Sequence, residues 1–184
     1  MPRLSMLAAV VLLCTSATVA LAQHAGTTGH STHGAMSPPD AREMLHFPPE
    51  MQSNFLGNMR DHMQTIDGIL QTMADGDYAG ASRIASERLG LDSPSAAGCK
   101  PDNAAATGSI SQSKPPAPGS MDEMMALYMP EAMRAVGLSM HTSASEFAAV
   151  ATQAATTHDG AAVVGALSRV TQNCVACHSA YRLR

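Results

Sequence analysis

The sequence has few of the residues that build β-sheets and few charged residues. Aromatic side chains make up 3% of the 184 residues and tryptophan is absent, whereas methionine occurs 14 times. Because aromatic and β-branched residues favour strands while alanine and methionine favour helices, this composition favours an all-α fold. Charged residues make up only 14% and the formal net charge is −4, so no basic excess indicates a nucleic-acid partner.

The chain also lacks an apolar run long enough to span a bilayer, which takes about 20 residues. Its strongest run, from Leu7 to Leu13, follows the basic Arg3 and precedes Ala20-Leu21-Ala22. A positive start, a short apolar run and an A-x-A site together are typical of a secretory signal peptide. We therefore expect residues 1–22 to be a signal peptide and the mature protein to be periplasmic, without a membrane span.

Two further stretches contain almost no large apolar residues. The first is residues 23–40, which are rich in Gly, Ser, Thr and His, and we expect residues 23–47 to form a disordered tail. Residues 91–119 contain five prolines, and we expect them to form a long loop. Thioether and imidazole side chains can bind copper, so a function in copper binding remains an alternative. The candidate ligands are His24, His30, His33 and Met36 in the tail, and Met121, Met124, Met125 and Met129 after the loop.

The remaining segments predict helices, because their apolar residues recur at steps of three and four. The first helix begins near Pro48-Pro49-Glu50 and ends at residues 74–76, and the second runs from Asp77 to Leu89. Ser120-x-x-Glu123 resembles a capping box, the third helix follows Pro130 and ends near Thr157, and Asp159 caps the fourth. The expected core stripes are Phe55, Met59, Met63, Ile66, Leu70 and Met73; Ile84 and Leu89; Met133, Val136, Met140, Phe147, Val150 and Ala154; and Val163, Leu167, Val170 and Cys174. These patterns predict an antiparallel four-helix bundle over residues 48–184.

The fourth helix ends in the motif Cys174-x-x-Cys177-His178, which has the spacing of a c-type haem attachment site. Two thiols at this spacing can add to the two vinyl groups of haem, and the adjacent imidazole can bind the iron. On a helix, side chains three and four residues apart share one face. A thioredoxin-like redox pair would need a βαβ pattern, and a zinc site would need a second ligand pair that Cys99 alone does not supply. The motif therefore predicts one covalent haem c.

A haem motif on the last helix of a four-helix chain resembles the cytochrome c′ family. The family pattern C-x-x-C-H-x-x-Y-R is present as Cys174, Cys177, His178, Tyr181 and Arg182. The resemblance implies an all-α, antiparallel four-helix bundle with haem c bound covalently to the C-terminal helix. It also implies that His178 is the proximal iron ligand and that Arg182 is the basic residue beside it.

The resemblance further implies that a residue of the first helix faces the other side of the iron. In low-spin relatives this residue is a methionine that binds the iron, and here the position falls on Met59. Met63 lies one turn away on the same stripe, and His62 lies one residue off it. In gas-binding relatives an apolar residue blocks the position, and Leu56 is the candidate. We expect cofactor binding by Cys174, Cys177, His178, Met59 and Arg182, with His178 and Met59 as the metal ligands.

These features predict a periplasmic monohaem cytochrome that exchanges single electrons with redox partner proteins. The alternative is a five-coordinate cytochrome c′ that binds nitric oxide or carbon monoxide. No base or proton-relay constellation accompanies the haem motif, so we do not expect an enzyme. The resemblance allows a homodimer. Cys99 has no partner cysteine in the mature chain, so an intermolecular disulfide, a reactive thiol and an inconsequential one all remain open.

Overall fold

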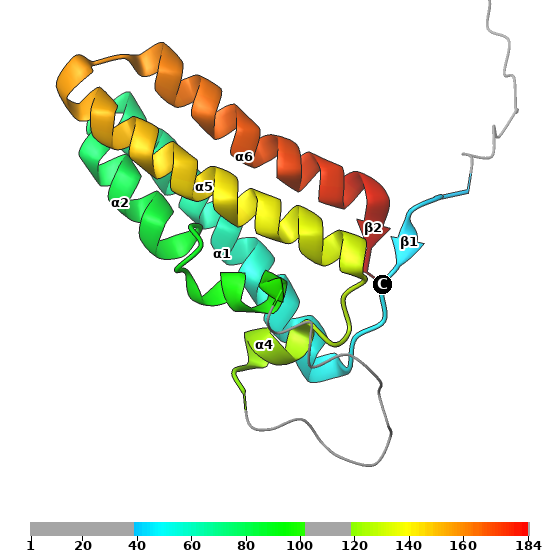
Figure 1. The fold of residues 1–184 in the computed structure, drawn as a ribbon. Coiled ribbons are helices and arrows are strands. Elements are labelled where there is room, and N and C mark those ends of the chain that lie inside the picture. The colour runs from blue at the N-terminus through cyan, green and yellow to red at the C-terminus, as the bar shows by residue number, and fades with distance from the viewer. Residues whose placement is uncertain (1–38, 102–118, 184) are drawn as a thin grey trace, which may run out of the picture. The chain divides into compact units, whose positions relative to one another are not determined.

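The computed structural model describes residues 39–101 and 119–183, and these residues are mostly helical (Figure 1). The helix ends agree with those expected from the sequence to within about two residues. The long helices are α1 (Pro49–Ala74), α2 (Tyr78–Arg88), α5 (Glu131–Thr157) and α6 (Gly160–Ala180), and the shorter elements are β1 (Glu43–Met44), the 3₁₀ helix η1 (Pro94–Cys99), α4 (Met121–Met125) and β2 (Tyr181–Arg182).

Local capping residues set the helix ends. The Asp77 carboxylate accepts a hydrogen bond from the Gly80 amide at 2.8 Å and starts α2. Asp159 does the same for α6, and Ser120 and Glu123 form the expected capping box at the start of α4. Each of these side chains satisfies backbone groups that the first helical turn leaves without a partner. The helix starts are therefore encoded within a few residues of sequence.

The core lies where α5 packs against both α2 and α6 and where α2 packs against α1 (Figure 1). The expected stripes of α5 and α6 are largely confirmed, although Val136 and Val150 are only half-buried. On α2, Leu89 is buried but Ile84 is only half-buried. The buried members of the α5 and α6 stripes are Met133, Met140, Phe147, Ala154, Val163, Leu167 and Val170.

The expected stripe on α1 is wrong at Met63 and Leu70, whereas Ile66 and Met73 pack against the core and Phe55 packs against a second apolar cluster. Met63 is 70% exposed and Leu70 is 49% exposed, whereas Thr65 and Ile69 are fully buried. Thr65 can face the core because its hydroxyl donates to the Asp61 carbonyl one turn earlier, at 2.7 Å. A pattern of apolar residues does not include this polar residue, although Thr65 and Ile69 are the fully buried residues of α1.

Part of the expected tail, residues 39–47, is ordered against the end of the chain, which corrects the sequence-based expectation. Strand β1 pairs in parallel with β2, and the Leu45 amide donates to the Arg182 carbonyl at 2.9 Å. Leu45 is 6% exposed, and Phe47 stacks on Phe55 with ring centroids 5.2 Å apart. The partners lie far away in sequence, so local composition does not reveal them. Residues 23–38 of that tail, and the expected signal peptide, lie outside the described residues.

The expected loop 91–119 contains a packed element, which is a second correction. Helix η1 contacts α4 and α5, and its residues Ala96 and Gly98 are buried. A Cβ on Gly98 would lie 2.5 Å from the Asp122 carbonyl oxygen, so only glycine allows this close approach. Residues 102–118 of the loop lie outside the described residues. Within the described part of the chain, no helix is both long and apolar enough to cross a membrane.

Phe147 tests this description of the core, because its side chain is fully buried. We expect Phe147→Ala to lower the free energy of unfolding by about 3–5 kcal/mol, through lost apolar burial and the cavity left behind. Val164 on α6 is 60% exposed, so Val164→Ala should change it by no more than about 0.5 kcal/mol. Urea denaturation of both variants measures the difference. Equal effects would contradict the core assignment.

Candidate functional site

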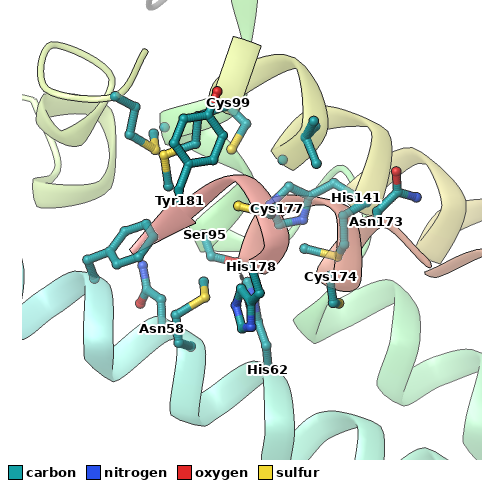
Figure 2. A pocket seen from close by; sticks show the side chains of 18 of the residues that line it. Asn58, His62, Ser95, Cys99, His141, Asn173, Cys174, Cys177, His178 and Tyr181 are labelled. Atoms are coloured by element: carbon teal, nitrogen blue, oxygen red, sulfur yellow. Dashed lines mark hydrogen bonds between the residues drawn. The ribbon is translucent and has the colours of Figure 1, made fainter. Parts of the chain in front are cut away.

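The three residues of the haem motif lie on one face near the end of α6. Cys174 and Cys177 are half-buried and His178 is exposed, and all three line a single cavity. Figure 2 shows them projecting from one helix into the same space. The spacing of three and four residues therefore places the three side chains on one face of the helix, as expected.

The cavity measures about 460 Å³ and is lined mainly by apolar side chains. This volume lies within the range of small-molecule and cofactor sites. Its walls come from the first half of α1, from η1, α4 and α5, from the end of α6, and from the residues around β1 and β2. The apolar lining residues include Phe55, Leu56, Ile66, Met129, Met133, Val136, Met140 and Val170.

The cysteines at this cavity are free thiols. Cys99, Cys174 and Cys177 form no disulfide, and burial raises the pKa of both Cys174 and Cys177. The Cys174 thiol lies 3.6 Å from the Val170 carbonyl, to which it donates. Two neutral thiols and an imidazole on one wall of an apolar cavity form the donor set that a covalently attached porphyrin requires. The residues present therefore fit haem c.

The predicted second ligand, Met59, is half-buried and lines the cavity. It belongs to neither of the two clusters that form the apolar core. Met63 also lines the cavity but is 70% exposed, and Leu56 is 37% exposed. Met59 is therefore better placed than Met63 to contact a group in the cavity.

The same wall contains a cluster of polar residues whose mutual contacts were not predicted from the sequence. His62 Nε2 lies 3.1 Å from Ser95 Oγ, and its ring meets the His141 ring edge-on with centroids 5.8 Å apart. His141 Nδ1 donates to the Leu89 carbonyl at 2.7 Å. Burial lowers the pKa of both histidines, that of His62 to about 4, where the neighbouring His141 contributes. Both rings are therefore neutral at pH 7.

Arg182, the other predicted cofactor residue, lines the cavity beside the end of α6. Its Nε donates to the Arg42 carbonyl at 3.3 Å and lies 3.5 Å from Asp40 Oδ2. Arg42 in turn bonds to Asp40 and donates from Nη1 to the His178 carbonyl at 3.3 Å. The Arg42 hydrogen bonds hold the pKa of the Asp40 carboxyl well below its usual range. The residues before β1 are thereby tied to the haem motif itself.

The four methionines that follow the loop, which are candidate copper ligands, do not form one site. Met125 and Met129 are buried in an apolar cluster with Met133 and Leu45, whereas Met121 and Met124 line a separate hollow near Tyr128. The histidines of the tail lie outside the described residues. Within residues 39–101 and 119–183, no three side chains of His, Cys, Asp or Glu are arranged to hold a metal ion.

Searches against protein-family models, curated proteins and solved structures find no match for this chain. The geometry of the site therefore carries the functional argument.

Cys99 is a third thiol of the cavity wall. Its Sγ packs against Gly137 of α5, where an added Cβ would lie 2.5 Å away. Burial, with the nearby Cys177 contributing, raises the pKa of the Cys99 thiol to about 11. This disfavours the interpretation of Cys99 as a reactive thiol, because a buried neutral thiol reacts slowly at neutral pH.

We expect the alkylation rate of Cys99 in the haem-free, reduced protein to rise about tenfold per pH unit from pH 8 up to about pH 11, because only the thiolate reacts. Mass spectrometry of the Cys99 peptide after timed iodoacetamide pulses measures this rate. The same peptide in urea provides the control and should level off near the ordinary pKa of 9.0. A plateau near pH 9 in the folded protein would contradict the burial of this thiol.

Proposed function

We propose that the chain is a monohaem c-type cytochrome that transfers single electrons. The observation that carries this proposal is that Cys174, Cys177 and His178 share one face of α6 and line an apolar cavity of about 460 Å³. In this proposal α1, α2, α5 and α6 form the antiparallel four-helix bundle of the cytochrome c′ type. The site would hold one haem c, which supplies the one-electron redox centre.

The protein's own residues would have separate roles. Cys174 and Cys177 would anchor the porphyrin by thioether bonds, and His178 would bind the iron from the α6 side. Arg182 lines the same cavity and would place its guanidinium beside the cofactor. The apolar walls would exclude water and so limit the rearrangement that accompanies a change of charge at the iron.

Large apolar side chains on the cavity wall support a bound apolar group. Leu56 and Met63 lie on the cavity wall and are unusually exposed for large apolar side chains. A planar apolar ring in the cavity would remove such surface from water, which favours binding.

Two residues of α1 could face a bound haem, one with a sulfur atom and one with an apolar side chain. Met59 is the ligand expected from the family resemblance, and its half-buried position on the cavity wall supports it. Leu56 lies on the same wall, which keeps the alternative of a five-coordinate cytochrome that binds nitric oxide or carbon monoxide. In the electron carrier an α1 side chain would bind the iron, and in the gas-binding cytochrome none would.

The location and partners belong to the proposal as well. The pattern of residues 1–22 favours export to the periplasm, where redox proteins would deliver and accept the electron. Association into a homodimer is compatible with this function and is not required by it.

Covalent attachment can be tested by the intact mass of protein matured in a bacterial host that attaches haem c. We expect wild-type protein to keep one haem after denaturing acid extraction, and the double variant Cys174→Ala, Cys177→Ala to lose it completely. Cys99→Ala is the matched control, because it removes a thiol from the same cavity and should keep the haem. A wild-type protein without haem, or a double variant that keeps it covalently, would refute the proposal.

A further inference from the structure

The inward face of α1 differs from the face expected from its methionines. Thr65 and Ile69 are the fully buried residues of this helix. His62 precedes Thr65 by three residues and Ile69 by seven, so it lies on the same face, one and two turns earlier. Met63 is turned away from this line and is 70% exposed. The helix therefore directs an imidazole, rather than the Met63 sulfur, toward the interior.

The His62 ring is held in place by contacts from other elements. Ser95 of η1 lies 3.1 Å from its Nε2, and His141 of α5 meets its ring edge-on at 5.8 Å between centroids. The Leu89 carbonyl accepts a hydrogen bond from His141 Nδ1 and so fixes the tautomer of that ring. Figure 2 shows the His62 side chain extending from α1 and that of His178 extending from α6 into the same cavity.

These contacts are the ones expected around a metal-binding histidine. Such a residue is neutral and uses one ring nitrogen for the metal, while the other holds a hydrogen bond that orients the ring. With Ser95 bonded at Nε2, the nitrogen left for a metal is Nδ1, and either imidazole nitrogen can serve. No described contact orients the Met59 thioether in a comparable way.

We propose that His62, rather than Met59, is the second axial ligand of the iron, so that the haem is held between His62 of α1 and His178 of α6. This inference rests on the proposed function. Two imidazoles give a lower reduction potential than one imidazole and one thioether. The protein would then donate electrons to a wider set of partners than a cytochrome with methionine ligation.

The test compares four haem-loaded proteins by optical and electron paramagnetic resonance spectra and by reduction potential. The proteins are wild type, His62→Ala, Met59→Leu and the control His46→Ala, which removes an exposed histidine that does not line the cavity. We expect low-spin spectra without a sulfur-to-iron band for all except His62→Ala. His62→Ala should become high-spin, and added imidazole, which fits the space left by the ring, should restore the low-spin spectrum.

A second variant covers the case in which His62→Ala fails to fold. His62→Met should keep a low-spin iron, gain the sulfur-to-iron band and raise the reduction potential. Low-spin iron that survives His62→Ala but is lost in Met59→Leu would overturn the inference and leave the proposed electron carrier standing. High-spin iron in the wild type would overturn it in favour of the gas-binding alternative. A wild-type protein that carries no haem would refute the proposed function itself.

Discussion

The structure depends on the division of its long helices into a packed half and a half that faces the cavity. On α6 the buried apolar residues end at Val170, and the donor side chains begin at Cys174. On α1 the fully buried residues are Thr65 and Ile69, and the cavity-lining residues precede them or reach only Ile66. Helices α2 and α5 join the packed halves in one apolar core, and the cavity lies along the other halves of α1 and α6.

The segment before α1 closes the site from the other end of the chain. Leu45 packs in one apolar cluster with Met129, Cys177 and Tyr181, and Arg42 donates to the His178 carbonyl. That carbonyl belongs to the last turn of α6, where backbone acceptors lack partners within the helix. Arg42, near the start of the first described segment, thus stabilises the turn that carries the expected proximal ligand.

Features encoded by neighbouring residues could be predicted from the sequence. Asp77, Asp159 and the Ser120–Glu123 capping box set the helix starts through contacts within three residues. The shared face of Cys174 and His178 follows from helix geometry alone. Such local rules predicted the helix ends and the shared face of the two thiols and the imidazole.

Features that depend on distant partners could not be predicted in this way. Strand β1 pairs with residues at the far end of the chain, and His62 gains its importance from Ser95 and His141, which belong to other elements. The apolar pattern of α1 includes Met63, which is exposed, because methionine counts as apolar. The pattern leaves out Thr65, which is polar but buried, because its hydroxyl is bonded within its own helix. The position of His62 within three residues of a buried stripe is the sequence feature that could have identified it as a residue of the site.

We propose that two thiols and an imidazole at the end of α6 hold a haem inside this helical fold. The most direct measurement is the optical spectrum of the purified, matured protein in its oxidised and reduced states. The account predicts an intense Soret band and, on reduction, the sharp visible bands of a c-type haem bound through thioethers. A colourless protein, in which Cys174 and Cys177 both react with an alkylating agent after unfolding, would contradict it.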